Sequence, residues 1–181
     1  MTSGQPAPHT VVVLLRAVNV GGGKLPMAEL RKLADDLGAT DVSTFIASGN
    51  LICAPPKDVK KFGTALEKAI EKKYGFFREC IMRTPAELTK ARGNYPFDVD
   101  DPKNGHIVFL LAKPTKTAIE EARGIETGAD AWEIIGQEWH IRYDHGAGRS
   151  DMKTATIQKA LGVPGTSRNL RTVEKLIELA T

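Results

Sequence analysis

Residues 11–37 read VVVLLRAVNVGGGKLPMAELRKLADDL and contain the signals that decide the fold. The apolar, valine-rich run over 11–18 predicts a strand that is covered on both faces of a sheet. Three glycines, 21–23, then interrupt the apolar pattern. Apolar residues recur at helical spacing over 27–37, and Pro26 suits a first helical position, so this segment predicts a helix. The chain therefore opens with a central strand, a glycine loop and a helix.

The next segments continue this alternation of strands and helices. Two short apolar segments, 42–46 and 51–54, flank Ser48-Gly49-Asn50 and predict a hairpin, because glycine and asparagine tolerate turn conformations. A second helix is expected from Asp58 to Gly75, followed by a strand over 76–82. The resulting order, βαββαβ, is that of the ferredoxin-like unit, in which helices cover one face of an antiparallel sheet.

The second part of the sequence repeats much of this order. A short helix over 84–91 and a loop over 93–105 mark the midpoint. A strand at 107–111, a helix from Thr115, strands at 131–135 and 139–143, and helices from about Ser150 and Asn169 follow, so this half is predicted to lack a last strand. We predict an α+β fold of two ferredoxin-like (split βαβ) halves with mainly antiparallel sheets and extra C-terminal helices. The predicted divisions are a disordered tail over 1–9, an N-terminal half over 10–92 and a C-terminal half over 93–181, which can form one compact unit.

Composition and charge exclude several classes of protein. A chain of 181 residues, 41% hydrophobic and 26% charged, can bury a core without disulfides or a metal. No apolar run approaches the roughly 20 residues that span a bilayer, and the N-terminus lacks a signal-peptide pattern. Cys53 and Cys80 lie in apolar segments and are expected to act as small hydrophobes, so we expect a cytoplasmic protein with no membrane partner. The net charge of +3 is mild for a dedicated nucleic-acid binder.

Four places combine glycine with polar or cationic residues, which lets a backbone approach and neutralise an anion. The first, RAVNVGGGK at 16–24, precedes a helix but matches neither a Walker loop nor a dinucleotide fingerprint. The second is the turn at 48–50. The third, GAGRS at 146–150, and the fourth, TSRN at 166–169, each set an arginine before a predicted helix. A turn or a helix cap is the structural alternative at each place.

Other chemistries have weaker support. Asp144, His145 and Ser150 lie on one loop without a nucleophile elbow, which disfavours a catalytic triad. The four histidines lack the spacing and the companion cysteines of zinc ligands, so no metal site is predicted; they are His9, His106, His140 and His145. Three aromatic residues are expected in the core or on a sheet face: Trp132, Trp139 and Tyr143.

Four blocks occur in an order that carries a family resemblance: residues 14–50, YPF at 95–97, GAGRS at 146–150 and TSRNLRTVEKL at 166–176. The chain resembles the bacterial domain-of-unknown-function family 1697 (DUF1697) over about residues 10–179. This resemblance implies a cytoplasmic α+β protein of ferredoxin-like halves and brings no established activity. The characteristic positions of the family fall on Arg16, Asn19, Gly21, Gly22, Ser48, Gly49, Asn50, Gly148, Arg149, Ser150, Arg168 and Asn169.

The chain departs from the usual family pattern at three positions. Ala17 stands where glycine is typical, Leu170 where tryptophan is common, and Asp151 where lysine commonly follows the Arg-Ser pair. Asp151 matters most, because it places an anion beside Arg149 and would weaken a phosphate site there unless Lys153 reaches in.

The leading hypothesis is a protein that binds an anionic, phosphate-bearing ligand such as a nucleotide in a cleft where Arg16, Arg149 and Arg168 converge with the glycine loops. The candidate ligand-binding residues are Arg16, Asn19, Gly21, Gly22, Lys24, Ser48, Gly49, Asn50, Gly148, Arg149, Ser150, Lys153, Arg168 and Asn169. One alternative is a hydrolase or transferase on the same cleft. Another is a protein or nucleic-acid interaction module that uses the basic excess after residue 140. The sequence requires no cofactor and fixes neither the ligand nor the oligomeric state.

Overall fold

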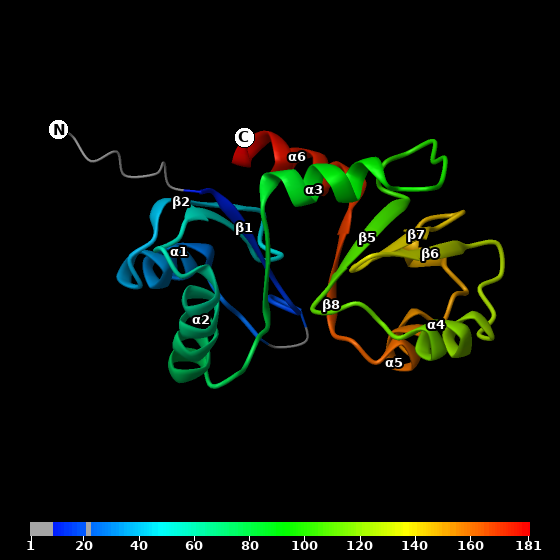
Figure 1. Ribbon diagram of the computed structural model, residues 1–181, viewed down its shortest axis with the longest axis horizontal. Coiled ribbons are helices and arrows are strands. Elements are labelled where there is room, and N and C mark those ends of the chain that lie inside the picture. The colour runs from blue at the N-terminus through cyan, green and yellow to red at the C-terminus, as the bar shows by residue number, and fades with distance from the viewer. Residues whose placement is uncertain (1–8, 21–22) are drawn as a thin grey trace. The chain divides into compact units, whose positions relative to one another are not determined.

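The computed structural model describes residues 9–20 and 23–181, so the predicted tail lies outside the described residues except for His9. The chain forms two compact units (Figure 1). Unit 1 runs up to Ala86 and includes Glu178–Thr181, and unit 2 comprises Glu87–Ile177. Each unit contains a four-stranded antiparallel sheet, which confirms the predicted α+β fold. The predicted division of the chain into residues 10–92 and 93–181 stays a prediction.

Unit 1 has the predicted βαββαβ order, and its strands are arranged β2-β3-β1-β4. The strand predicted from residue 76 begins only at Cys80, because the residues before it form a loop that packs on the end of β1. Its elements are β1 (Val11–Leu15), α1 (Met27–Asp36), β2 (Thr40–Phe45), β3 (Asn50–Ala54), α2 (Val59–Tyr74) and β4 (Cys80–Arg83).

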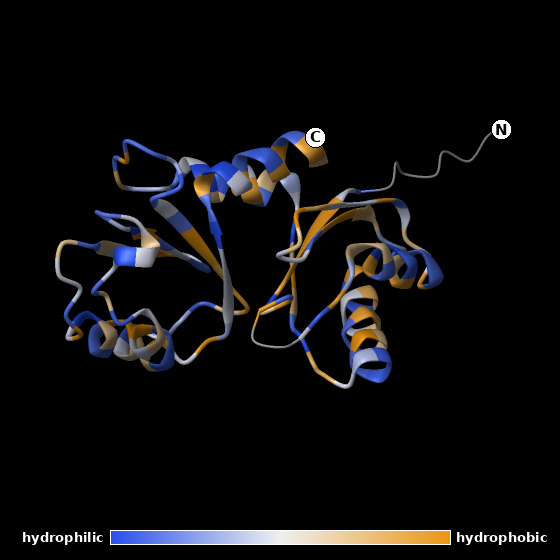
Figure 2. Cartoon of the chain, turned by 180° about the vertical axis from the view of Figure 1, so that it is seen from behind, coloured by the Kyte–Doolittle hydropathy of each residue, from blue (hydrophilic) through white to orange (hydrophobic). Residues whose placement is uncertain are grey.

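The core of unit 1 explains its unbroken apolar first strand. Val11, Val13 and Leu15 pack with residues of α1 and α2, whereas Val12 and Leu14 lie on the opposite face and are equally buried. Figure 2 shows the strands of this sheet as mainly hydrophobic and both helices as mixed. The ends of α2 follow the predicted rules. The Asp58 carboxylate accepts a bond from the Lys61 amide at 3.0 Å, and the following C-cap glycine adopts a left-handed conformation.

Unit 2 contains a strand that was not predicted from the sequence. The prediction that the second half lacks its last strand is wrong, because β8 (Gly165–Asn169) pairs with β5 and completes a second βαββαβ order. The polar composition of β8 hides it, and its place at the sheet edge, in the order β6-β7-β5-β8, tolerates that composition. The remaining elements of the chain, of which α3 begins and α6 ends in unit 1, are α3 (Pro85–Gly93), β5 (Gly105–Leu110), α4 (Lys116–Arg123), β6 (Ala131–Ile135), β7 (Glu138–Arg142), η1 (Ala147–Arg149), α5 (Thr154–Leu161) and α6 (Leu170–Ala180).

The helix predicted from Ser150 also begins elsewhere. Helix α5 starts at Thr154, because the Ser150 hydroxyl donates to the buried Asp130 carboxylate at 2.5 Å and accepts the Met152 amide at 3.0 Å. These bonds use Ser150 to close a loop and leave it outside the helix. By contrast, Asn169 is the predicted cap of α6, and its side-chain oxygen accepts the Thr172 amide at 2.8 Å.

The aromatic residues of unit 2 lie in its core, as predicted. Trp132, Trp139 and Tyr143 are buried, and the two tryptophan rings meet edge to face at 6.2 Å. Both cysteines are buried and free. Over residues 9–20 and 23–181, no helix combines the length and the apolar character that crossing a membrane requires.

Candidate functional site

Three loops of unit 1 meet at one end of its sheet. Leu14 pairs with Asn50 and Leu15 pairs with Cys80, so the C-terminal end of β1 lies beside the N-terminal ends of β3 and β4. The Leu15 amide donates to the Gly49 carbonyl at 2.9 Å, and the next amide donates to the Glu79 carbonyl at 3.0 Å. We call the described parts of these loops, residues 16–20, 23–26, 46–49 and 75–79, the loop cluster. Two of the four places predicted from the sequence, 16–24 and 48–50, therefore adjoin in space.

Asn19 connects two of these loops through its side-chain amide. Its Nδ2 donates to the Ala47 carbonyl at 2.6 Å and to the Leu25 carbonyl at 3.1 Å, while its Oδ1 accepts the Leu25 amide at 2.8 Å. Its backbone φ is +57°, a left-handed conformation that asparagine tolerates better than most residues. Asn19 thus fixes the path from β1 into α1 and ties it to the hairpin.

The hairpin residues of the loop cluster have clear structural roles. The side-chain Nδ2 of Asn50 donates to the Phe45 carbonyl at 2.9 Å and to the Ser48 hydroxyl at 3.1 Å, and these bonds close the turn. Gly49 has φ +87°, and a Cβ there would lie 3.0 Å from the Leu15 Cβ. A larger residue at Gly49 would therefore meet both backbone strain and a steric clash.

Ala17 and Ile46 also adopt positive φ values, +51° each, in the same loop cluster. Such conformations cost about 1–2 kcal/mol for residues with a Cβ, and they persist only where surrounding contacts hold them. The positive φ at Ala17 explains physically why glycine is typical at this position in the family that the chain resembles.

These loops contribute the cations Arg16, Lys24 and Arg78. The Arg16 guanidinium pairs with the Glu79 carboxylate at 3.2 Å, so part of its charge is neutralised. Lys24 is exposed. Arg78 was not predicted from the sequence, because a single arginine before a strand forms no motif; only the tertiary structure reveals its place.

Arg78 is held against the loop that precedes α1. Its Nε donates to the Ala17 carbonyl at 2.9 Å and its Nη1 to the Phe77 carbonyl at 2.8 Å, and the guanidinium lies over the Phe76 ring at 4.6 Å. A Cβ on Gly23 would lie 2.7 Å from Nη2. Within the described residues no hydrogen bond from Nη2 is seen, whereas Nε and Nη1 each donate to a carbonyl.

The N-terminus of α1 lies at the end of the same loop. Its N-cap is Pro26, which makes no side-chain capping bond, so the N-cap residue leaves the first-turn amides without a side-chain acceptor. Such amides carry partial positive charge and attract anions. The acidic residue of this turn, Glu29, is paired with Lys73. Gly21 and Gly22, also predicted for this site, lie outside the described residues.

The third predicted place forms an exposed turn in unit 2. Gly148 and Arg149 are exposed on η1, and Lys153 is the exposed N-cap of α5. Asp130 fixes this turn by accepting the Ser150 hydroxyl and the Asp144 amide. His145 contacts Asp144 at 3.4 Å, but Ser150 bonds to Asp130, so these residues do not form the triad considered above.

Acidic side chains line the adjoining pocket of unit 2. This pocket measures about 100 Å³ and contains three aspartates and one arginine; it is lined by Asp98, Val99, Asp100, Asn104, Arg142, Tyr143 and Asp144. Carboxylates repel anions, so this end of unit 2 is less suited to phosphate than the loop cluster of unit 1.

The fourth predicted place corrects the interpretation of Arg168. Arg168 lies on β8 and not at a helix start, it is 6% exposed, and burial lowers its pKa to about 10. Its Nη1 donates to the Thr166 hydroxyl at 2.7 Å and to the Ser167 carbonyl at 2.8 Å. Within unit 2, the exposed Arg149 and the buried Arg168 therefore do not present their guanidinium groups to one solvent-exposed site.

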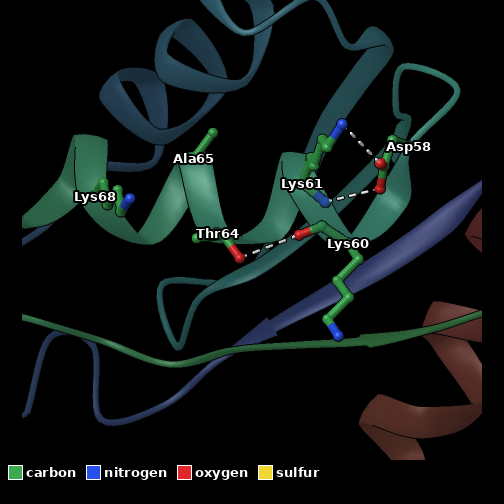
Figure 3. Close-up of a pocket in the computed structure, with 6 residues that line it drawn as sticks. All are labelled: Asp58, Lys60, Lys61, Thr64, Ala65 and Lys68. Carbon is green, nitrogen blue, oxygen red and sulfur yellow. Dashed lines mark hydrogen bonds and ion pairs between the residues drawn. The ribbon is translucent and has the colours of Figure 1, made fainter.

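A groove of about 480 Å³ along α2 is lined by Asp58, Lys60, Lys61, Thr64, Ala65 and Lys68 (Figure 3). Its polar groups already serve the helix, because Asp58 caps it and the Thr64 hydroxyl donates to the Lys60 carbonyl at 3.2 Å. All of these residues come from one helix and its cap, so the groove is a solvated helix face. Among the described residues, no group of three or more His, Cys, Asp or Glu side chains could hold a metal ion.

The protein is thus an α+β protein of two ferredoxin-like units, and unit 1 carries a cationic loop cluster. The chain belongs to the family described as "Protein of unknown function (DUF1697)", whose model matches residues 9–140. No curated protein matches the chain.

Two solved structures show similarity to the chain. The conserved bacterial protein SP0830 from Streptococcus pneumoniae is 22% identical with a TM-score of 0.73, and the match covers 96% of this chain and 99% of that one. This similarity supports the fold alone. A structure described as a "putative glycine cleavage system transcriptional repressor" is 15% identical, covers 88% of this chain and 95% of that one, and has a TM-score of 0.25, too low for any argument.

Proposed function

We propose that the loop cluster of unit 1 binds the phosphate group of a small phosphate-bearing ligand. The observation that carries this proposal is the set of bonds from Asn19, which fixes the loop beside Arg78 and leads into the uncapped first turn of α1. Backbone amides, Lys24 and Arg78 would supply the donors. This set comes from unit 1 alone and is smaller than the one predicted from the sequence, which also contained Arg149 and Arg168 of unit 2.

The physical basis is a group of donors that are ordered before the ligand arrives. Arg78 is already held by two carbonyl oxygens and an aromatic ring, so binding would cost little side-chain entropy. Arginine forms directional, charge-assisted bonds to phosphate oxygens. Because Lys24 is exposed and Arg16 partly exposed, the affinity should also fall as salt is added.

Calorimetric titration with inorganic phosphate and adenosine monophosphate tests this proposal. Arg78→Ala should weaken binding by about ten-fold or more, since a hydrogen bond to a charged group contributes about 1.5–3 kcal/mol. Arg149→Ala is the matched control from unit 2 and should leave the Kd unchanged. Binding that depends on Arg149 and not on Arg78 would refute the proposal, as would no binding of either probe to the wild type.

A hydrolase-type activity is a second candidate, and one pair of residues in unit 2 favours it. The Oγ of the exposed Ser167 lies 3.0 Å from Nδ1 of His106, and Nε2 of His106 lies 3.1 Å from the Lys103 carbonyl. A carbonyl only accepts, so Nε2 carries the proton and Nδ1 accepts the serine hydroxyl. Burial lowers the pKa of His106, which favours the neutral, basic form. This is the geometry of a nucleophile with its base.

Labelling with a fluorophosphonate tests the second candidate directly. Ser167 should be modified, and both Ser167→Ala and His106→Gln should abolish the labelling. Ser150→Ala is the control, because the Ser150 hydroxyl donates to a carboxylate and not to a histidine. Failure of the probe to modify Ser167 would remove this candidate without affecting the phosphate proposal.

A further inference from the structure

Three exposed apolar side chains come from the loops of the loop cluster. Val20 is 60% exposed, Ile46 49% and Phe77 46%. Single exposed hydrophobic residues are common on protein surfaces, but a group of them beside polar donors marks a binding surface. The two other large apolar residues that are similarly exposed among the described residues, Leu111 and Leu179, lie outside these loops.

Hydrogen bonds between the loops involve the sequence neighbours of these three residues. Val20 follows Asn19, whose amide bonds to the Ala47 carbonyl, and Ile46 directly precedes Ala47. Phe77 directly precedes Arg78, whose guanidinium bonds to the carbonyl of Ala17. Each of the three apolar residues is therefore next in sequence to a residue whose hydrogen bond joins two of the loops.

Ile46 adds a second observation. A β-branched residue at φ +51° is a conformational outlier, because its Cβ and branches crowd the backbone. The fold nevertheless holds an isoleucine there with about half of its surface exposed. Neither burial nor backbone preference accounts for this residue, whereas contact with an apolar ligand would.

We infer that the ligand of the loop cluster is a phosphate monoester with a compact apolar group, aromatic or short aliphatic, next to the phosphate. This inference rests on the proposed phosphate site and adds the class of molecule that carries the phosphate. The apolar group covers Phe77 and its apolar neighbours while Arg78 and the first turn of α1 bind the phosphate. Each CH₂ that becomes buried raises the affinity roughly four-fold.

A small ligand fits these observations better than an anionic membrane surface. Arg78 has a fixed direction, set by two carbonyl oxygens and the Phe76 ring, and Asn19 fixes the backbone beside it. A bilayer presents many mobile headgroups and gains little from donors held in one place. Three side chains also offer a small apolar area for stable insertion into a membrane.

Calorimetric titration with inorganic phosphate, phenyl phosphate and butyl phosphate tests the inference. The wild type should bind at least one ester about ten-fold or more tightly than inorganic phosphate, and the better ester reveals whether the apolar group is aromatic or aliphatic. Phe77→Ser should reduce that preference to below about three-fold, because it removes the apolar contact with the ester but keeps the Phe77 carbonyl that holds Arg78. Leu111→Ser, which removes a similarly exposed residue from unit 2, is the matched control and should keep the full preference.

The possible failures are distinguishable. If inorganic phosphate and both esters bind equally well, the apolar part of the inference is overturned while the phosphate proposal stands. If no probe binds, both are overturned. Sedimentation with phosphatidylglycerol vesicles tests the membrane alternative. If the wild type binds the vesicles, Phe77→Ser abolishes this binding and the esters are not preferred over inorganic phosphate, the surface binds membranes and the inference is overturned.

Discussion

Replacing Asn19 by alanine should destabilise the protein by about 2.5–4 kcal/mol. The substitution removes three side-chain hydrogen bonds, each worth about 0.5–1 kcal/mol at a partly exposed position. It also leaves alanine at φ +57°, which costs about 1 kcal/mol more than asparagine or glycine there. Asn19→Gly loses the same bonds without the conformational cost, so it should be less destabilising than alanine by about 1 kcal/mol.

Urea denaturation of the full chain measures both differences. Asn94→Ala is the control, because Asn94 is exposed and no side-chain bond involves it within the described residues; it should change stability by less than about 0.5 kcal/mol. An Asn19→Ala variant as stable as the control would refute the role of this side chain in joining the loops. Equal stabilities of the alanine and glycine variants would refute the backbone part of the reasoning.

Three further predictions concern the cores. Gly105→Ala should destabilise by about 1–3 kcal/mol in urea denaturation, because the new Cβ would lie 2.5 Å from Cδ1 of Leu170. Burial lowers the pKa of His140 from 6.5 to about 4, so the unfolded chain binds this proton at a higher pH than the folded chain does. The free energy of unfolding should therefore fall as the pH drops from about 6.5 towards 4. In His140→Leu, denaturation curves should show a smaller change of this free energy with pH. Burial raises the pKa of the Cys53 thiol to about 12 and also raises that of Cys80, so iodoacetamide at pH 8 should modify neither thiol until denaturant is added, as mass spectrometry can record.

Local chemistry made most elements predictable from the sequence. Five consecutive buried residues in β1 need an unbroken apolar run, and the sequence has one. The ends of α2 carry Asp58 and Gly75, and the start of α4 carries Thr115, whose hydroxyl accepts the Ala118 amide at 3.1 Å. Each signal acts within a few residues of its effect, which is why sequence alone reveals it.

Elements set by distant contacts were not predictable in the same way. Strand β8 consists largely of small and polar residues, and the hydrogen bonds that make it a strand come from β5, more than fifty residues away. The same holds for Ser150, whose local pattern suggests a helix start but whose hydroxyl binds Asp130. In both places a tertiary partner overrides the local preference.

The candidate site shows the same division. The glycine and arginine content of residues 16–24 suggested anion binding, but the sequence does not reveal that this segment meets the 46–49 turn, because the bond from Asn19 to Ala47 spans 28 residues. Arg78 joins the site through strand register, since β4 enters the sheet beside the end of β1. Arg168 was assigned to a helix start because β8 was not recognised.

The most direct test of the phosphate site is a map of backbone amide shifts by NMR during titration of the full chain with inorganic phosphate. We predict that the largest saturable shifts occur at Gly23, Lys24 and the first-turn amides of Met27–Glu29, and that Arg78→Ala weakens them. Saturable shifts confined to residues 146–153, or no saturable shift anywhere, would contradict the assignment of phosphate binding to the loop cluster.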